Sequence, residues 1–283
     1  PCGPTPLGSR RTPVRNMADP AAPIGVFDSG VGGLTVVRQL MTRLPHESIV
    51  YFGDTARVPY GTKSPRTVIR YAESCTRILI ERGIKLLVVA CNTASSCALD
   101  ALRGQYDVPV IGVIEPGARA AVKATRTGAI GVAGTAATIA SGAYPKAIAA
   151  IAPQLNVLCQ ACPLLVPLAE EGWTDGDVPR AVAQRYLAPM LAWNMDTLVL
   201  GCTHYPLLKK TIAAVAGATV ALVDSAEETA AEVETLLDQH HLRASETAPR
   251  HAQFLVSDGP AAFTAIGERF LGFPLESVEW VDF

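Results

Sequence analysis

Short runs of consecutive apolar residues recur along this chain, with longer stretches of mixed polarity between them. The runs are continuous rather than alternating, which is typical of strands covered on both faces in a parallel sheet. They predict nine strands, at Ile24–Phe27, Ile49–Phe52, Leu86–Ala90, Val110–Ile114, Ala129–Ala133, Val157–Cys159, Leu198–Gly201, Val220–Val223 and Phe254–Val256.

Between the predicted strands, apolar residues fall at helical spacing. One stripe consists of Val178, Val182, Tyr186 and Met190, and another of Ala230, Val233 and Leu237. Alternating strands and helices predict an α/β fold with right-handed crossovers, whose functional loops lie at the carboxyl ends of the strands.

Composition excludes several classes of protein. Charged residues make up 18% of the 283 and apolar residues 49%, which excludes disorder for most of the chain. The net charge of −2 gives no general reason to bind nucleic acid or a membrane surface. Between Thr127 and Ala169 only Lys146 is charged, but repeated Gly and Pro exclude a spanning helix there.

Residues 1–22 are rich in proline and lack the continuous apolar segment of a signal peptide. We therefore expect them to form a disordered leader. The seven cysteines are odd in number and irregularly spaced, which favours free thiols in a reducing cytoplasm.

Most of the cysteines are expected to be structural. Cys159 and Cys162 form a CxxC motif, for which a thioredoxin-like thiol pair is the alternative, while a zinc site lacks two further ligands. Buried cysteines usually pack as small apolar residues. We expect this role for the CxxC pair and for Cys75 and Cys97, which fall in helical patterns, and we assign Cys2 to the leader.

The glycine-rich segments do not match nucleotide-binding motifs. Gly30, Gly32 and Gly33 follow the first strand, but Thr35 stands where a dinucleotide fingerprint needs its last glycine. The segment beginning at Gly61 lacks the order of a phosphate loop. We expect the three glycines to permit a tight strand-to-helix turn.

Cys91 and Cys202 differ from the other cysteines because their surroundings repeat. Each ends an apolar strand and is predicted to open a helix, with Thr93 and Ser95 as caps in one case and Pro206 near the first turn in the other. A thiolate at a helix N-terminus is stabilised by free N–H groups and the helix dipole. The repeat favours a catalytic role for both thiols.

His204 is the histidine nearest a strand end and follows Cys202 by two residues, so it is placed to tune that thiol. A cysteine-protease pair would use one cysteine and leave the other unexplained. Two matched acid–base groups suit racemisation, in which one thiolate removes a proton from carbon and an opposite thiol returns one. Asn92, Thr93, Thr203 and Ser29 are candidates to hold carboxylate oxygens, and Asp28 the ammonium.

Four motifs occur in order, at Asp28–Thr35 (DSGVGGLT), Phe52–Gly61 (FGDTARVPYG), Ala90–Ser95 (ACNTAS) and Gly201–Pro206 (GCTHYP). They closely resemble the signatures of the glutamate racemases, members of the aspartate/glutamate racemase family. The resemblance runs from about residue 23 to near the C-terminus. It implies an isomerase that interconverts L- and D-glutamate without cofactor or metal and supplies D-glutamate for cell-wall peptidoglycan.

By motif match, the resemblance makes Cys91 and Cys202 the two bases. It also implies a substrate site of Asp28, Ser29, Tyr60, Gly61, Asn92, Thr93, Thr203 and His204. Thr135 and Thr138 are implied to bind the side-chain carboxylate, and either Glu170 or Glu171 to assist His204.

The same resemblance implies an architecture. It predicts two pseudo-symmetric α/β lobes, one of residues 23–114 and 226–283 and one of residues 115–225, with the active site in the cleft between them. It also implies a cytoplasmic homodimer that acts on glutamate, with no nucleic-acid or membrane partner. Aspartate racemase or a related two-cysteine isomerase is the nearest alternative, and a thiol-redox protein using Cys159 and Cys162 is the alternative from another class.

Overall fold

A computed structural model describes residues 19–247 and 249–282 and arranges them around two sheets. The first sheet has the order β10-β9-β2-β1-β3-β4 and the second β6-β5-β7-β8, and each neighbouring pair of strands is parallel. The strands are β1 (Ile24–Asp28), β2 (Ile49–Gly53), β3 (Leu86–Val89), β4 (Val110–Gly112), β5 (Ala129–Gly134), β6 (Asn156–Ala161), β7 (Thr197–Gly201), β8 (Ala221–Asp224), β9 (Ala252–Val256) and β10 (Glu279–Trp280).

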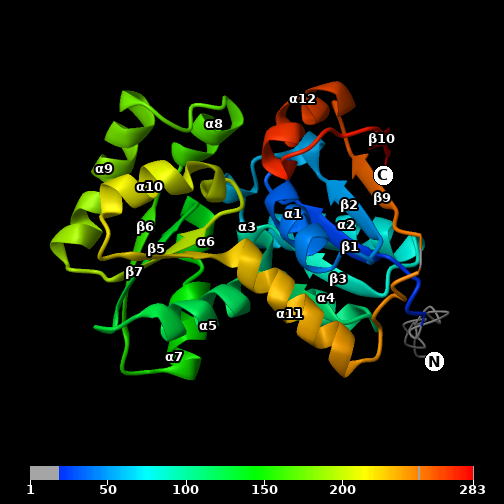
Figure 1. Ribbon diagram of the computed structural model, residues 1–283, viewed down its shortest axis with the longest axis horizontal. Helices are drawn as coiled ribbons and strands as arrows, with labels where there is room; N and C mark the ends of the chain where they lie inside the picture. The colour runs from blue at the N-terminus through cyan, green and yellow to red at the C-terminus, as the bar shows by residue number, and fades with distance from the viewer. Residues whose placement is uncertain (1–18, 248, 283) are drawn as a thin grey trace, which may run out of the picture.

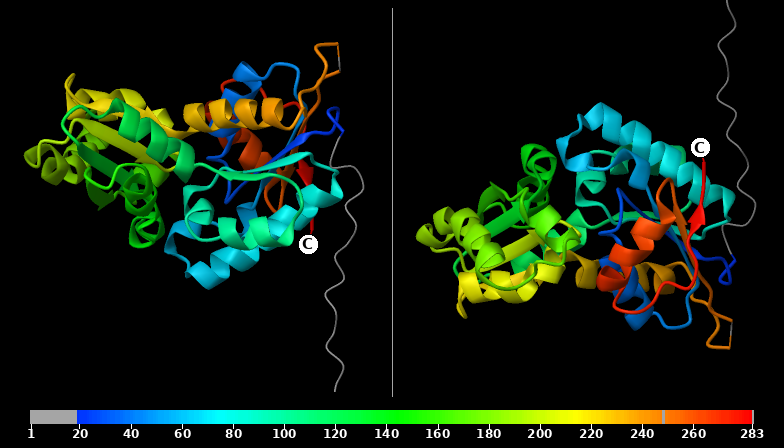
Figure 2. Two further views of the ribbon diagram at one scale, coloured as in Figure 1. Left: turned by 90° about the horizontal axis from the view of Figure 1, so that it is seen from below. Right: turned by 90° about the horizontal axis from the view of Figure 1, so that it is seen from above.

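Helices follow most of the strands. They are α1 (Leu34–Arg43), α2 (Pro65–Glu81), α3 (Asn92–Ser95), α4 (Leu99–Gln105), α5 (Ile114–Ala124), α6 (Ala136–Ala140), α7 (Ala143–Ile151), α8 (Leu165–Glu170), α9 (Asp177–Ala192), α10 (Lys209–Ala216), α11 (Ser225–Gln239) and α12 (Pro260–Leu271). Three short 3₁₀ helices are η1 (Thr55–Arg57), η2 (Tyr60–Thr62) and η3 (Tyr205–Leu208). Figures 1 and 2 show the two sheets side by side, the second in green and yellow.

The predicted α/β class with two mainly parallel sheets is confirmed, and all nine predicted strands overlap observed ones. The two-residue strand β10 was not predicted, because its residues are exposed and form no apolar run. Of the predicted helical stripes, the one on α11 is confirmed, since Ala230, Val233 and Leu237 are buried.

The stripe predicted on α9 is confirmed only in part: Met190 is buried, but Val178 is 51% exposed. The buried residues of the helix are Pro179, Ala183, Leu187 and Met190. The helix is therefore rotated by about one residue from the prediction. Small residues at Pro179 and Ala183 allow close packing, and the larger side chains of Val182 and Tyr186 cover the core only in part.

Alternate residues of the strands pack on opposite faces, which explains their continuous apolar runs. Along β1, Ile24 and Val26 belong to one core cluster and Phe27 to another. The first of these clusters also includes Leu198 and Leu200 of β7, so apolar packing extends from one sheet to the other. The central strands are consequently buried on both sides, as is typical of parallel sheets.

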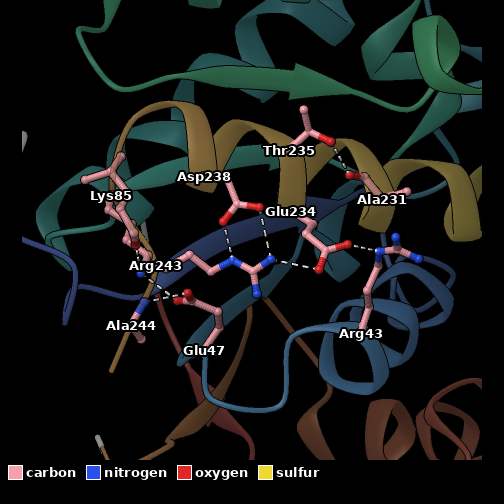
Figure 3. Close-up of polar contacts among 10 residues, drawn as sticks. Arg43, Glu47, Lys85, Ala231, Glu234, Thr235, Asp238, Arg243 and Ala244 are labelled. Carbon is pink, nitrogen blue, oxygen red and sulfur yellow. Dashed lines mark hydrogen bonds and ion pairs between the residues drawn. The ribbon is translucent and has the colours of Figure 1, made fainter. Parts of the chain in front are cut away.

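The C-terminal end of α11 is fastened to the first sheet by charged groups (Figure 3). Arg243 donates to Asp238 at 2.7 Å and to Glu234 at 2.7 Å, and Glu234 also pairs with Arg43 of α1. Beside them, the almost fully buried Lys85 and Glu47 form an ion pair at 2.5 Å. Because α11 follows directly on β8, these contacts fix the return of the chain from one sheet to the other.

Residues 1–18 of the expected leader lie outside the described residues, and so does Cys2. The last four residues of that segment are placed: Ala21 donates its N–H to Asp19, and the carbonyl of Pro20 accepts from Lys85 at 2.6 Å. Among the described helices, none is both long enough and apolar enough to cross a membrane.

Candidate active site

The carboxyl ends of strands from both sheets surround one cavity of about 350 Å³. It is lined by Ser29, Gly30, Val58, Pro59, Tyr60, Gly61, Thr62, Cys91, Asn92, Thr93, Thr135, Ala136, Pro163, Val166, Pro167, Glu170, Cys202, Thr203 and His204. The structure thus brings together the site residues named from the sequence except Asp28 and Thr138, which are buried and do not line the cavity. Such positions at strand ends are where ligands bind in α/β folds.

Cys91 contributes its thiol from the first sheet. It is 5% exposed, occupies the N-cap position of α3 directly after β3, and its Sγ lies 3.7 Å from Ser29 Oγ. Burial and then the charge of Asp28 raise the pKa of Cys91 to about 12, although the Ala94 N–H and the Ser29 hydroxyl act to lower it. The helix terminus therefore offsets only part of the desolvation, and Cys91 rests as the thiol.

The expected caps of α3 are wrong. Neither Thr93 nor Ser95 stands at the N-cap, because both lie inside the helix. Ser95 instead donates to the carbonyl of Val89 at 2.7 Å and so ties the helix to the end of β3.

Cys202 contributes the second thiol, from the second sheet. It follows β7 and is 6% exposed, and its Sγ lies 3.8 Å from His204 Nδ1. The prediction that it opens a helix is wrong: a turn intervenes, and His204 is the N-cap of η3, with Pro206 in its first turn. Each cysteine follows the end of a strand, but only Cys91 lies at the N-terminus of a helix.

His204 lies between Cys202 and Glu170. Its Nε2 is 2.9 Å from Glu170 Oε1, and its ring meets Phe270 edge-on. Burial alone would lower the pKa of His204, but hydrogen bonds to Cys202 and Glu170, with the charges of Cys202 and Asp28, raise it to about 10. Of the two glutamates considered from the sequence, Glu170 is the one in contact, whereas Glu171 is exposed.

Asp28 is completely buried behind the cavity wall. Its Oδ2 accepts from the Gly30 N–H at 3.1 Å, and its Oδ1 has no partner among the described residues. Burial raises the pKa of Asp28, while the nearby His204 and neighbouring backbone N–H groups act to lower it. Its carboxylate does not line the cavity, but it is near enough to His204 and Cys91 for its charge to shift the pKa of both groups.

The expected turn glycines act through close approach rather than through unusual backbone angles. None of Gly30, Gly32 and Gly33 has a positive φ. A Cβ at Gly32 would lie 2.3 Å from Thr203 Oγ1 and 2.5 Å from His204 Nδ1. Glycine at this position lets the loop after β1 touch the loop after β7, which closes one side of the cavity.

Hydroxyl groups from both sheets meet at another side of the cavity. Thr93 Oγ1 lies 3.0 Å from Thr135 Oγ1 and 3.2 Å from Thr138 Oγ1. Beside them, Asn92 Oδ1 accepts from the hydroxyl of Tyr144 at 2.8 Å. Thr138 is buried and does not line the cavity, so it supports Thr135 rather than facing a ligand.

Tyr60 is anchored by a buried carboxylate, that of Asp54. The Tyr60 hydroxyl donates a short hydrogen bond to Asp54, which is completely buried. Asp54 also accepts two bonds from Arg57 at 2.8 and 2.9 Å and one from Ser257 at 3.0 Å. Asp54 therefore holds the segment from Arg57 to Gly61, which forms part of the cavity wall.

The remaining cysteines have features of structural residues. Cys159 and Cys162 are free, and burial raises the pKa of both thiols, that of Cys162 to about 12. A redox-active CxxC pair typically has a lowered thiol pKa. Cys75 lies in α2 as expected, but the helical prediction for Cys97 is wrong, since it lies in the turn between α3 and α4.

The described residues hold no group of three or more His, Cys, Asp or Glu side chains arranged to bind a metal ion. The polar groups that face the cavity are thiols, hydroxyls, an amide, an imidazole and one carboxylate. Such a set suits binding of a small polar molecule and transfer of protons to and from it.

Comparisons with known proteins agree with this chemistry. Residues 34–233 match the model of the Asp/Glu/hydantoin racemase family. The chain is 56% identical over 255 residues to the glutamate racemase of Geobacter metallireducens, covering 90% of this chain and 94% of the relative.

Two crystal structures are similar over almost their whole length. Glutamate racemase isoform RacE1 of Bacillus anthracis has a TM-score of 0.89 at 42% identity, covering 92% of this chain and 97% of that one. The Francisella tularensis enzyme in complex with D-glutamate has a TM-score of 0.87 at 38% identity, covering 93% and 98%. The chain therefore belongs to the Asp/Glu/hydantoin racemase family and, within it, to the glutamate racemases.

Proposed function

We propose that this chain is a racemase that interconverts L- and D-glutamate with two cysteine bases, Cys91 and Cys202. One observation carries the proposal: the two thiols follow the carboxyl ends of strands in different sheets and line one small cavity. A substrate carbon held between them would have one thiol on each face. D-Glutamate produced in this way is a building block for bacterial peptidoglycan.

In each turnover, the thiolate of one cysteine takes the proton from Cα, and the pair of electrons from the C–H bond remains on the substrate. The thiol of the other cysteine then gives its proton to the opposite face of Cα. The product has the inverted configuration, and the two sulfur atoms have exchanged protonation states. Because a Cα proton is far less acidic than a thiol, the site must stabilise the carbanionic transition state.

The neighbouring polar groups are suited to hold the substrate. We assign Ser29, Asn92, Thr93 and Thr203 to carboxylate oxygens, with Tyr60 and Gly61 forming the wall beside them. Asp28, buried next to Ser29, supplies negative charge for the substrate ammonium. Thr135, supported by Thr138, lies on the far side of Thr93 and is assigned to the side-chain carboxylate.

His204 and Glu170 are assigned to the Cys202 side of the reaction. His204 Nδ1 lies 3.8 Å from Cys202 Sγ, and Glu170, 2.9 Å from His204 Nε2, favours the charged imidazolium beside that sulfur. Cys91, whose pKa is raised, begins as the proton donor in this arrangement. The enzyme would then first act on the enantiomer whose Cα proton faces Cys202.

The family resemblance supports three further proposals. Residues 23–114 with 226–283 and residues 115–225 form two lobes around the cavity, the active molecule is a homodimer, and the reaction takes place in the cytoplasm, where free thiols persist. Analytical ultracentrifugation tests the dimer, which requires a sedimenting mass of about twice the chain's 29.8 kDa.

The activity is tested by offering L- and D-glutamate separately, without added cofactor. The loss of the circular dichroism signal of the glutamate enantiomer is followed over time. Both enantiomers should reach the same racemic end point. Aspartate, offered in parallel, should react far more slowly, because its carboxylate is one methylene short of Thr135. Faster turnover of aspartate than of glutamate would show that the chain is an aspartate racemase instead.

The thiol-redox alternative is separated by one further variant. Replacing both Cys159 and Cys162 with serine should leave racemisation intact, because neither thiol lines the cavity. Loss of activity in that variant, with activity surviving in Cys91→Ala, would favour the redox protein.

A further inference from the structure

Tyr144 reaches from the helices of the second sheet to a residue at the end of the first. It lies in the first turn of α7, and its side chain is 1% exposed. Its hydroxyl donates to Asn92 Oδ1 at 2.8 Å, and Asn92 opens α3 directly after Cys91. This hydrogen bond therefore joins elements of the two sheets beside the candidate catalytic thiol.

The bond determines which end of the Asn92 amide is free. An asparagine side chain has one acceptor oxygen and one nitrogen with two N–H donors. Tyr144 occupies the oxygen, and Asn92 Nδ2 is buried without any hydrogen-bond partner among the described residues. Buried donors are normally paired, so this nitrogen is available to an acceptor on a ligand in the cavity that Asn92 lines.

We propose that Tyr144 is a positioning residue of the racemase: by holding Asn92 Oδ1, it fixes the amide so that Nδ2 faces a carboxylate of the bound substrate. The proposal rests on the function proposed above, which supplies that carboxylate. An amide turned the other way would present its oxygen to the carboxylate and repel it. Tyr144 itself touches no substrate and acts through Asn92.

The surroundings of Tyr144 make its position specific. A Cβ at Gly201 would lie 3.1 Å from the Tyr144 ring, and one at Gly117 would lie 3.4 Å from both its ring and its hydroxyl. Two glycines therefore leave the space that the ring fills. Burial raises the pKa of Tyr144 and outweighs a hydrogen bond from Ser225 that acts to lower it. The hydroxyl therefore stays protonated and able to donate.

The proposal is tested with Tyr144→Phe, which keeps the ring and removes only the hydroxyl. Losing one hydrogen bond that orients a substrate donor should lower kcat/KM for glutamate by about tenfold, mostly through a higher KM. The decisive variant is the double substitution of Tyr144→Phe with Asn92→Ala. Its kcat/KM should equal that of Asn92→Ala alone, because Tyr144 has nothing left to position.

Tyr106→Phe is the matched control, since the Tyr106 hydroxyl donates to the carbonyl of Glu73 at 3.4 Å and does not line the cavity. It should have wild-type kinetics. Thermal unfolding of every variant confirms that the folded enzyme is being compared. Should Tyr144→Phe unfold at the assay temperature, Asn92→Asp replaces it, because a carboxylate keeps an acceptor for Tyr144 but offers the substrate no donor.

The positioning role is overturned if Tyr144→Phe keeps wild-type kcat/KM, if it lowers the activity of Asn92→Ala by a further tenfold, or if Asn92→Asp is fully active. Failure of the proposed function has a different signature, because the wild-type chain itself would then not racemise glutamate.

Discussion

The two halves of the candidate site share a pattern of sequence but differ in their chemical surroundings. Both cysteines follow a buried parallel strand and both are almost completely buried. Cys91 caps an α-helix and has Ser29 and the buried Asp28 for neighbours, whereas Cys202 precedes a turn and has the His204–Glu170 pair.

This difference puts the two thiols in unequal electrostatic surroundings. On the Cys91 side, desolvation and a nearby negative charge raise the thiol pKa to about 12. On the Cys202 side, an imidazolium held by Glu170 provides a positive charge. In the proposed two-base reaction one sulfur takes a proton while the other gives one, and the two sulfurs have different charged neighbours. Strand ends of the same kind thus place the two sulfurs, and the groups around each sulfur make the two sides unequal.

The largest effect is expected when either sulfur is removed. Cys91→Ala and Cys202→Ala should each lower racemisation by about 10³-fold or more, because general acid–base steps contribute about 10²–10⁴-fold. Circular dichroism of the folded protein should be unchanged, since each substitution removes one atom from a small buried side chain. Wild-type turnover in either variant would show that the missing sulfur is not one of the two bases and would contradict the two-cysteine mechanism.

A smaller effect should follow from disrupting the charged pair on the Cys202 side alone. His204→Gln is expected to lower kcat/KM by about 10²-fold, because the substitution removes the positive charge beside Cys202. Glu170→Gln should act in the same direction but more weakly, since Glu170 is partly exposed and acts through His204. The measurement is kcat/KM as a function of pH for the wild type and the two variants, compared on the acid and the alkaline side of the profile.

Glu171→Gln is the matched control, because this neighbouring glutamate is exposed. It should leave the pH–rate profile unchanged. An effect of Glu171→Gln as large as that of Glu170→Gln would contradict the assignment of the His204 partner.

The wall of the cavity offers a third test, which touches neither thiol. Asp54→Asn weakens the acceptor shared by Tyr60, Arg57 and Ser257, so the segment that ends at Gly61 should lose its fixed position. We expect KM to rise by about tenfold with kcat less affected, in line with the loss of about one charged hydrogen bond. A fall in kcat with unchanged KM would place Asp54 in the chemistry instead.

The last prediction concerns stability and its dependence on pH rather than catalytic activity. The folded pKa of His204 is raised to about 10 from 6.5, so its charged contacts contribute stability that is complete below pH 6.5 and is lost as the pH rises towards 10. The free energy of unfolding of the wild type should therefore exceed that of His204→Gln most at pH 6 and least at pH 10. Urea titrations at these two pH values measure the difference, and a constant gap would contradict the charged imidazole.

The parts of the fold that the sequence predicted have a physical reason in common. Strands buried on both faces leave continuous apolar runs, so the strands that precede Cys91 and Cys202 were predictable. The meeting of the two thiols followed only from the family resemblance, because the two strands belong to different sheets. The same argument fails for β10, which is exposed and has no apolar run.

The supporting contacts of the site were not predictable in this way. Tyr144 belongs to no motif and lies in an ordinary apolar helix, so only the tertiary structure shows its bond to Asn92 of α3. Asp54 accepts hydrogen bonds from Arg57, three residues away, and from Ser257, which is 203 residues away. The first bond could have been predicted from the local sequence, but the second could not. Long-range hydrogen bonds of this kind depend on tertiary structure and leave no periodic pattern in the chain.

The central claim is most directly tested by racemising glutamate in heavy water and stopping at low conversion. If Cys91 and Cys202 act on opposite faces, the newly formed enantiomer should carry one solvent deuterium at Cα, while the remaining substrate stays almost entirely protiated. Mass spectrometry of the separated enantiomers gives both values. A product that retains its original proton, or a substrate that gains deuterium as fast as the product does, would contradict the two-cysteine account.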